Sequence, residues 1–557
     1  MNASTPLRFV IIGGVAAGAS AAARARRLDE NAQITLIERG PDVSFANCGL
    51  PYYIGGEIKQ REALAVQTPQ TLKAMLNLDV RTGTEAIGID RAGKRVQLRT
   101  VASGATEWLS YDKLLLAPGA TPLRPNLPGI EDPRVHTLRS LQDMDRIHGA
   151  TVSAQQIAVV GAGFIGLEMA EQFVRLGKKV TLIEMLDQVL PPLDRPMTLL
   201  LEDELRRHGV ELALGDGISG FERGNQITCL LKSGRRVAAD FVVLSIGVRP
   251  ETGLARDAGL ALGERGHIHV DQFMRTSDPD VYAAGDAIET HDLVGRNPTV
   301  VALGGPANRE GRLVADHIFR PASAKPFPGA LGTAIVRAFE VSAGITGWSE
   351  KRIRAAGLPF RCVTVNDNHH AGYFPGAKPI ILKLCWDPVS GRILGAQATG
   401  LAGVDKRLDV LATALAGGLT IDDLSELELS YAPPFGSAKD IVNIAGFTAV
   451  NTREGLVDPI DTIPDEPSVQ VVDVRPAALS KAHPVPHAGV INIPLPELRK
   501  RCSELDASRP VVTVCALGKT SYFAARVLAQ RGFRVQSLTG GLRARFDPRS
   551  PAKLPTP

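Results

Sequence analysis

The run Ile157-Ala158-Val159-Val160-Gly161-Ala162-Gly163-Phe164-Ile165-Gly166 decides the fold. Four apolar residues that suit a buried strand lead into a G-x-G-x-x-G turn, and Leu167–Leu176 continues with helical periodicity. A second strand is expected over Val180–Glu184. In this context the glycines allow a tight turn and a close backbone approach to a pyrophosphate at the helix N-terminus. The run therefore predicts a βαβ unit that binds a dinucleotide.

Glu184 indicates which dinucleotide binds here. It ends the second strand, 18 residues after Gly166, where a carboxylate accepts the ribose 2′-hydroxyl and repels a 2′-phosphate. No Arg or Lys follows it in Met185-Leu186-Asp187. We therefore expect NADH rather than NADPH. The residues expected to bind it are Gly161, Gly163, Phe164, Ile165, Gly166, Glu184 and Gly247.

A second unit of the same kind opens the chain. A strand is expected over Leu7–Ile12, a helix over Ala16–Leu28 and a second strand over Gln33–Glu38. The turn between strand and helix is Gly13-Gly14-Val15-Ala16-Ala17-Gly18, in which Val15 replaces the middle glycine. Two such units about 150 residues apart predict two nucleotide-binding domains rather than a short repeat.

Bulk composition limits the function classes. A chain of 557 residues with 44% hydrophobic and 22% charged residues predicts three to five soluble domains. A net charge of +4 gives no reason to expect nucleic acid. Six irregularly spaced cysteines favour a reducing compartment with free thiols. No apolar run approaches 18 residues, so we expect a cytoplasmic protein without a membrane partner.

A third motif connects the two units with a family. Leu116–Ala120 lies between the glycine turns, and Asp280–Ala287 contains Ala-Gly-Asp. Together with the two turns, these stretches resemble the two-dinucleotide-binding flavoprotein disulfide reductases over about residues 7–450. The resemblance implies FAD at the first turn, NADH at the second, and a helix from Gly304 that faces the flavin. The expected FAD-binding residues are Gly13, Gly14, Ala17, Gly18, Glu38, Arg39, Asn47, Gly119, Asp286 and Ala302.

One cysteine, Cys48, follows the first unit in Ser44–Tyr53. Val43 and Tyr53 stand where a second cysteine would complete C-x-x-x-x-C, which excludes a dithiol relay within this loop. A single cysteine must form a mixed disulfide, a sulfenate or a persulfide. The run resembles the coenzyme A disulfide reductases and the NADH-dependent persulfide reductases, which implies that Cys48 is the redox nucleophile. A buried structural cysteine is the alternative.

The same resemblance implies a bound coenzyme A and a homodimer. Arg24, Arg26 and Arg27 lie on the first expected helix, although a solvated helix face would also explain them. The expected substrate contacts are Ser44, Phe45, Arg24, Arg27 and Lys73. Tyr373 and Tyr431 resemble two catalytic tyrosines that reach the redox cysteine across the dimer, with simple packing as the alternative. His369 and His370 are expected to be loop residues without a metal.

A compact α/β module follows towards the C-terminus. Val471–Arg475, Ile491–Leu495, Val511–Ser521 and Thr539–Leu542 resemble a single rhodanese domain. In it, backbone N–H groups would stabilise a catalytic thiolate or persulfide on Cys515, aided by Lys519. Ser521 replaces the arginine of related phosphatase loops, so phosphatase chemistry is not expected. An inactive rhodanese fold is the alternative, because Pro486-His487 departs from the pattern. Cys229, Cys362, Cys385 and Cys502 are expected to be ordinary buried thiols.

The expected architecture is α/β. It has two Rossmann-like dinucleotide-binding domains, an α+β dimerisation domain and a C-terminal α/β rhodanese-like domain. The expected bounds are 1–150 with 270–330 for FAD, 151–269 for NADH, 331–450 for dimerisation, 451–467 for a linker, 468–546 for the rhodanese-like domain and 547–557 for a disordered tail.

These features predict an FAD-dependent NADH:persulfide or polysulfide reductase. It would act on coenzyme A persulfide and release hydrosulfide and thiol, with Cys515 as a persulfide carrier. Persulfide is favoured because a rhodanese domain has no evident role in reducing a coenzyme A disulfide. Coenzyme A disulfide reductase, a thiosulfate-type sulfurtransferase with an accessory flavoprotein, and a redox sensor that signals through Cys48 remain as alternatives. An NADH oxidase side reaction is also open.

Overall fold

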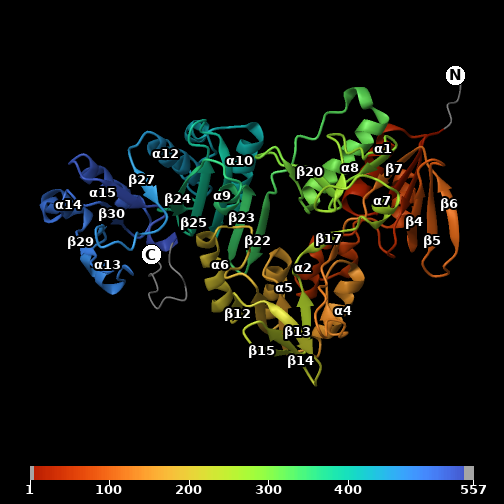
Figure 1. The fold of residues 1–557 in the computed structure, drawn as a ribbon, viewed down its shortest axis with the longest axis horizontal. Coiled ribbons are helices and arrows are strands. Elements are labelled where there is room, and N and C mark those ends of the chain that lie inside the picture. The colour runs from red at the N-terminus through yellow and green to blue at the C-terminus, as the bar shows by residue number, and fades with distance from the viewer. Residues whose placement is uncertain (1–5, 545–557) are drawn as a thin grey trace. The chain divides into compact units, whose positions relative to one another are not determined.

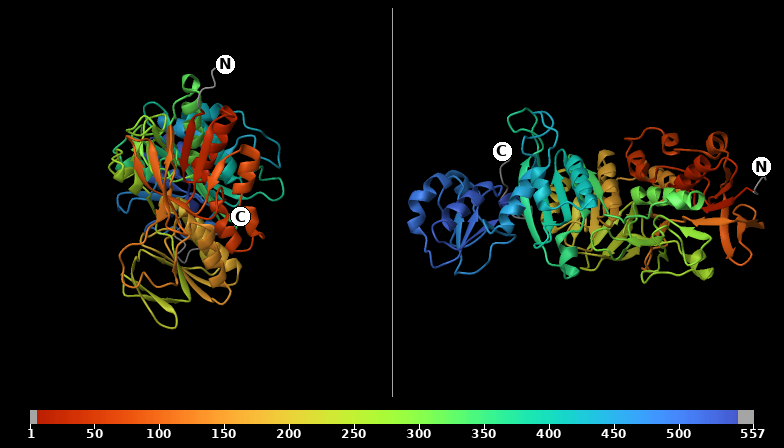
Figure 2. Two further views of the ribbon diagram at one scale, coloured as in Figure 1. Left: turned by 90° about the vertical axis from the view of Figure 1, so that its right-hand side faces the viewer. Right: turned by 90° about the horizontal axis from the view of Figure 1, so that it is seen from above.

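The computed structural model describes residues 6–544, so the expected tail and the last two residues of the expected rhodanese range lie outside the described residues. The chain forms two compact units. The first comprises residues up to 185 and 216–332, and the second comprises 186–215 and the chain from 333 onward. Figures 1 and 2 show the elements of each unit, which are described here one unit at a time.

The first unit opens with the expected βαβ motif, formed by β1 (Arg8–Ile12), α1 (Ala16–Leu28) and β2 (Gln33–Ile37). These strands belong to a parallel sheet of order β19-β7-β1-β2-β3. The other three strands are β3 (Asp79–Arg81), β7 (Lys113–Leu116) and β19 (Val281–Ala283). Strand β19 comes late in the chain but pairs with β7 in this sheet, and Asp286 follows its last residue closely. The sheet therefore brings Asp286 to the same ends of the strands as the first glycine turn.

A long helix covers this sheet next to α1 (Figure 1). It is α8 (Gly304–Phe319), which begins at the expected Gly304. A Cβ on Gly311 would lie 2.0 Å from the carbonyl oxygen of Ala17, so the two helices approach closely where both residues are small. This contact fixes α8 against the helix that carries the first glycine turn.

The second βαβ motif comprises β10 (Gln156–Val160), α5 (Phe164–Arg175) and β11 (Lys179–Glu184). The helix begins at Phe164, three residues before the expected Leu167, because the glycine turn leads straight into it. Within the first unit, β11, β10, β16 (Phe241–Leu244) and β9 (Val135–His136) lie in this order and run parallel. The predicted pair of Rossmann-like domains is confirmed.

The first unit also contains two three-stranded antiparallel sheets, which lie outside the glycine turns. One contains β4 (Thr84–Asp90), β5 (Arg95–Thr100) and β6 (Thr106–Ser110). The other contains β13 (Ile218–Glu222), β14 (Ile227–Leu231) and β15 (Arg236–Ala239).

The second unit contains the expected α+β domain. Its antiparallel sheet has the order β22-β23-β26-β25-β24, so β24 lies at an edge. The strands are β22 (Ala334–Ala338), β23 (Val341–Gly347), β24 (Arg361–Asn368), β25 (Pro379–Trp386) and β26 (Ile393–Gly400). Helix α10 (Val404–Gly417) packs on β23 and β26, and α12 (Ile441–Arg453) packs on β24 and β25.

A second sheet of this unit forms the rhodanese-like domain. Five parallel strands have the order β27-β31-β30-β28-β29. They are β27 (Asp458–Ile460), β28 (Gln470–Asp473), β29 (Ile491–Asn492), β30 (Val511–Val514) and β31 (Val535–Leu538), with helices α13 (Ala477–Ala482), α14 (Leu495–Arg501) and α15 (Lys519–Ala529). The expected linker, 451–467, is therefore wrong at β27. A three-residue edge strand binds through its backbone and needs no apolar periodicity.

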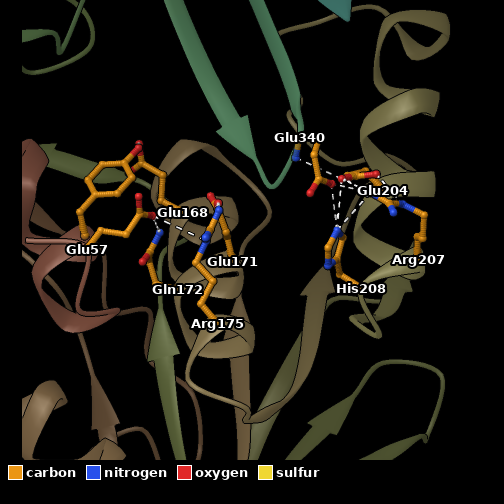
Figure 3. A network of polar contacts seen from close by, with 10 residues as sticks. Glu57, Glu168, Glu171, Gln172, Arg175, Glu204, Arg207, His208 and Glu340 are labelled. Atoms are coloured by element: carbon orange, nitrogen blue, oxygen red, sulfur yellow. Dashed lines mark hydrogen bonds and ion pairs between the residues drawn. The ribbon is translucent and has the colours of Figure 1, made fainter. Parts of the chain in front are cut away.

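A polar network fastens α6 (Arg195–Arg207) to the turn between β22 and β23 (Figure 3). Arg207 pairs with Glu204 at 2.8 Å and with Glu340 on the turn. The His208 ring lies 3.1 Å from a Glu340 oxygen and stacks on Phe339 with ring centroids 3.7 Å apart. Hydrogen bonds with Glu204 and His208 lower the pKa of Glu340 to about 2. The carboxylate therefore stays ionised across the neutral range and holds the turn to the helix end.

A buried carboxyl lies in the core behind the first glycine turn. Glu310 on α8 is 2% exposed and accepts a hydrogen bond from the backbone N–H of Gly285 at 2.8 Å. Loss of water outweighs this bond and, with the nearby charge of Asp286, raises the pKa of Glu310 to about 7. The folded protein thus favours the protonated carboxyl up to neutral pH.

We predict that Glu310→Gln removes a pH-dependent loss of stability. Because the folded pKa lies above the unfolded value, the stabilisation is complete below about pH 4.5 and is lost as pH rises through 7. A neutral amide keeps the hydrogen bond without this loss, which is on the order of 3 kcal/mol. Thermal melting should therefore rise in the variant at pH 8 and change little at pH 5. The exposed control Glu264→Gln should follow the wild type, and a variant with an unchanged pH slope would refute the assignment.

Candidate redox centre and C-terminal cysteine site

The Cys48 loop is fastened to the first glycine turn. The Ser44 N–H donates to the Gly14 carbonyl at 2.8 Å, and Ser44 adopts a left-handed φ of 51°. Cys48 then lies in a short 3-10 turn, Asn47–Gly49, directly before α2 (Leu50–Ile54). A Cβ on Gly49 would lie 2.4 Å from a methyl carbon of Leu64, so a larger residue there would require the Leu64 side chain to move. The loop presents Cys48 as an exposed thiol, which argues against the buried structural alternative.

The surroundings of Cys48 disfavour its ionisation. Partial loss of water raises the pKa of the thiol, and the charges of Glu168 and Asp286 raise it further. The side-chain oxygen of Asn47 accepts a hydrogen bond from the Cys48 backbone N–H at 3.2 Å. Two carboxylates from distant parts of the sequence thus act on one sulfur, which is typical of a functional site.

Glu168 was missed by the sequence analysis. It lies on α5, two residues after the second glycine turn, and accepts a hydrogen bond from the Tyr52 hydroxyl at 3.2 Å (Figure 3). On the same helix, Gln172 donates to Glu57 at 2.8 Å. These bonds join the helix that follows Cys48 to the helix of the second glycine turn. Its sequence position did indicate a special role, because Glu168 is a single carboxylate in the otherwise apolar start of α5.

The first glycine turn fits FAD. Glu38 accepts hydrogen bonds from the N–H groups of Gly14 at 3.0 Å and Gly40 at 2.8 Å, so its carboxylate lies at the turn. Burial raises the pKa of Asp286, and no hydrogen bond from the described residues satisfies its carboxylate. A largely desolvated acceptor without a protein donor suits a ligand hydroxyl. Gly119, with φ of 73°, lies beside Arg139.

The second glycine turn repeats the geometry of the first. Glu184 accepts a hydrogen bond from the N–H of Ala162 at 2.7 Å, as Glu38 does from Gly14. A Cβ on Gly163 would meet open space, which leaves room for a ligand beside the backbone. Gly247, with φ of 112°, follows β16 at the same edge. The residues predicted to bind NADH therefore surround one turn.

A basic cavity of about 290 Å³ lies between α1 and the end of α8. Arg24 lines it and forms an ion pair with Asp316 at 2.6 Å. Four further cations that the sequence analysis missed also line it: Arg309, Arg312, Arg320 and Lys325. Arg309 and Arg312 had a signal in their three-residue spacing on α8, whereas Arg320 and Lys325 follow the helix and had none.

The other expected basic contacts lie elsewhere. Arg27 and Lys73 do not line this cavity, and Lys73 donates to Asn77 at 2.8 Å. Arg26 is buried and donates to four backbone carbonyls, including that of Leu76 at 2.8 Å, so its role is structural. Phe45 pairs with Ala65 in the loop beside Cys48. Of the three arginines on α1, the structure places only Arg24 in the cavity.

Tyr373 and Tyr431 lie together in the second unit. Their hydroxyls are 2.9 Å apart, and the side chains are 76% and 48% exposed, so neither is a packing tyrosine. The hydrogen bond between the two hydroxyls raises the pKa of Tyr373. His369 and His370 contact backbone carbonyls of Lys378 and Ala371.

Cys515 lies at the end of β30 in a cradle of backbone N–H groups. Its sulfur accepts hydrogen bonds from the N–H of Gly518 at 3.1 Å and of Ser521 at 3.3 Å. Gly518 caps α15 with φ of 91°, which turns its N–H towards the sulfur. Donors aimed at one atom from a helix N-terminus stabilise an anion there. The side chain is 2% exposed, so the loop must open to admit a sulfur donor.

The remaining cysteines only partly match the expectation of ordinary buried thiols. Cys229 is buried, and burial raises its pKa to about 12. Cys502 is partly exposed, and Cys362 and Cys385 are joined by a disulfide. The expectation of free thiols is therefore wrong for this pair. The two residues are 23 positions apart and meet only because of the β24–β25 register, which the sequence does not reveal.

Among the described residues, no helix is both long enough and apolar enough to cross a membrane.

Known protein families match each of the three successive parts of the chain. A model of the pyridine nucleotide-disulphide oxidoreductase family matches residues 7–305, and that family's dimerisation domain matches 333–440. A rhodanese-like domain matches 457–545, which begins one residue before β27.

Similar proteins include curated and structurally solved relatives. Coenzyme A disulfide reductase of Staphylococcus aureus is 34% identical over 79% of this chain and 99% of its own length. The structure of reduced Bacillus anthracis CoADR-RHD is 42% identical, covers 97% of both chains and has a TM-score of 0.93. A NAD-dependent persulfide reductase from A. fulgidus is 39% identical, covers 97% of this chain and 100% of its own, and has a TM-score of 0.91.

Because the first family model spans more than half of the 557 residues and meets both glycine turns and the Cys48 loop, the chain belongs to the pyridine nucleotide-disulphide oxidoreductase family, with that family's dimerisation domain and a rhodanese-like domain in the same chain.

Proposed function

We propose that this chain is an FAD-dependent NADH:persulfide reductase that acts on coenzyme A persulfide and related sulfane-sulfur compounds. The observation that carries the proposal is the presence of two differently held sulfurs. Cys48 is exposed in a loop bonded to the first glycine turn, and Cys515 is cradled by N–H groups in the rhodanese-like domain. The similar A. fulgidus protein, named a persulfide reductase, extends over both domains.

Each cofactor has a group of residues that suits it. FAD would be held at the first turn by Glu38, by Asp286 and by the N-terminal end of α8, and it supplies the two-electron relay from NADH to sulfur when bound. NADH would bind at the second turn, where the Glu184 carboxylate suits a ribose diol. The remaining residues predicted at each turn are proposed in the same roles.

Cys48 carries the bond-breaking step. Its thiolate attacks the sulfur–sulfur bond of a persulfide, which releases a thiol and leaves sulfane sulfur on Cys48. Two electrons from NADH then release hydrosulfide and restore the Cys48 thiolate. The net reaction is RSSH + NADH → RSH + HS⁻ + NAD⁺. We also propose a homodimer through the dimerisation domain, with the Tyr373–Tyr431 pair as proton donors to the departing thiolate.

The basic cavity supports coenzyme A as the carrier of the sulfur. Five cations and a single carboxylate line about 290 Å³, a charge balance that suits the phosphates of a nucleotide. Arg24, predicted from the sequence as a substrate contact, lines this cavity, which supports the proposal. Arg27, Lys73, Ser44 and Phe45, which do not line the cavity, are proposed as further substrate contacts.

Specific observations also support two other functions. The Staphylococcus aureus relative, named a coenzyme A disulfide reductase, matches 79% of this chain, which favours disulfide reduction. The N–H cradle of Cys515 favours sulfurtransferase activity in its own right. Persulfide reduction uses both cysteines in one reaction sequence, with Cys515 as the persulfide carrier.

We predict that Cys48→Ser lowers NADH oxidation with coenzyme A persulfide by at least 100-fold, because serine cannot store sulfane sulfur. NADH absorbance and hydrosulfide release should be measured together. Cys229→Ser, which changes a buried thiol, should keep the wild-type rate. Turnover of coenzyme A disulfide alone would make the chain a disulfide reductase, and no Cys48-dependent turnover would refute both readings.

We predict that Cys515→Ser has the opposite effect to Cys48→Ser on the two activities. Transfer of sulfur from thiosulfate to cyanide should be lost, because the cradle has no sulfur to hold, while NADH oxidation with free coenzyme A persulfide should stay within about twofold. Cys48→Ser should retain the transfer. Loss of NADH oxidation in Cys515→Ser would contradict separate roles for the two cysteines.

We predict that the basic cavity sets the affinity for coenzyme A. Replacing one phosphate-binding cation removes a charge-assisted contact, which should raise KM for coenzyme A persulfide roughly tenfold or more and leave kcat nearly constant. Arg309→Ala and Arg24→Gln test this, with Arg256→Ala, an exposed arginine that does not line the cavity, as the control. Glutathione persulfide, which has no nucleotide, should show no such change. Equal effects on both substrates would remove the cavity from the proposal.

A further inference from the structure

The dimerisation sheet carries two sulfurs that the proposed reaction does not use. Cys362 on β24 lies directly opposite Cys385 on β25, with Cα atoms 4.3 Å apart, and the two form a disulfide. Cys385 is 1% exposed, whereas Cys362 is only partly buried. Cys362 is therefore the partner of the pair that is more open to a small molecule.

Strand β24 is also where the rhodanese-like domain contacts this sheet. The Thr364 N–H donates to the Thr539 hydroxyl at 2.8 Å, and that hydroxyl donates to the Thr364 carbonyl at 3.1 Å. Arg361 lies 3.4 Å from Asp458 of β27. Cys362 thus lies between two contacts with the rhodanese-like domain. Since alternate residues of a strand share a face, it points to the same side as the Thr364 side chain.

These contacts lead directly to the cradle of Cys515. The Asn366 amide donates to the Leu517 carbonyl at 3.2 Å, and Leu517 is in the Cys515 loop. The same amide donates to the Gly540 carbonyl at 2.7 Å. A Cβ on the next residue, Gly541, would lie 2.4 Å from the Gly518 nitrogen, whose N–H donates to the Cys515 sulfur. A displacement of β24 would therefore move atoms that hold the cradle.

We propose that Cys362 and Cys385 form a reversible dithiol–disulfide pair that is oxidised by sulfane sulfur and whose state sets the rigidity of the Cys515 loop. Bridged, β24 is covalently tied to its neighbour β25. Reduced, this edge strand is held by backbone hydrogen bonds and by the rhodanese-like domain. The class of oxidant rests on the proposed function, but the pair itself does not need NADH or Cys48.

The oxidation balances in two steps. The Cys362 thiolate takes the outer sulfur of a persulfide RSSH, so that RSH leaves and Cys362 carries a persulfide. The Cys385 thiolate then attacks the inner sulfur of that persulfide and releases hydrosulfide. The sum is two protein thiols + RSSH → protein disulfide + RSH + H₂S. A dithiol reductant returns the pair to the thiol form by exchange.

The chemistry can be tested in the full-length Cys48→Ser protein without NADH, which separates it from the proposed reductase activity. The protein is reduced with dithiothreitol, desalted anaerobically, treated with glutathione persulfide and alkylated. Peptide mass spectrometry should then find Cys362 bridged to Cys385 in most molecules. One more hydrosulfide should be released per chain than in the same protein with Cys362→Ser and Cys385→Ser. A pair that resists dithiothreitol, or that stays a dithiol under persulfide, would overturn the proposal.

Hydrogen exchange tests the coupling to Cys515. Amides of residues 361–368 and 515–521 should exchange at least threefold faster in the dithiol form than in the bridged form. The single variant Cys362→Ser should show the faster pattern whatever its treatment, and Cys502→Ser should behave as the wild type. Equal exchange rates for residues 515–521 in both states would show that the disulfide is only a local cross-link, and would overturn its proposed effect on the Cys515 loop.

Discussion

The close approach of helix to strand at each glycine turn is the constraint on which the first unit depends. A Cβ on Gly18 would lie 1.8 Å from the Gly13 carbonyl oxygen, and one on Gly166 would lie 1.9 Å from that of Gly161. The first glycine of each turn has φ near 100°, which only glycine adopts without strain. These contacts place two helix N-termini at strand ends and leave the acids Glu38 and Glu184 bonded to the turns. The Cys48 loop is fastened to the first of these turns.

The two reactive sulfurs have opposite surroundings. Cys48 is exposed and lies under the influence of two carboxylates, which raise its pKa. Cys515 is enclosed and accepts hydrogen bonds from two backbone N–H groups that favour negative charge. The second arrangement suits a sulfur that holds a persulfide anion. One chain thus provides two distinct environments for the same element.

The sequence predicted what local chemistry determines. Both glycine turns, the bounds of α1 and the place of Cys515 at a strand end follow from residues close together in the chain. Features that depend on how distant segments align in the fold could not be predicted. Neither Cys362–Cys385 nor the cavity between α1 and α8 can be read from spacing, because each joins segments whose alignment only the fold sets. Strand β27 was missed because its pairing is made by backbone groups.

The Thr539 hydroxyl has a consequence for how the domains can be separated. It satisfies both the N–H and the C=O of Thr364 at the outer edge of β24, where another strand could otherwise pair. An excised dimerisation domain would therefore expose a ready template for strand addition between molecules. The rhodanese-like domain therefore also prevents the dimerisation sheet from associating with other molecules through the edge of β24.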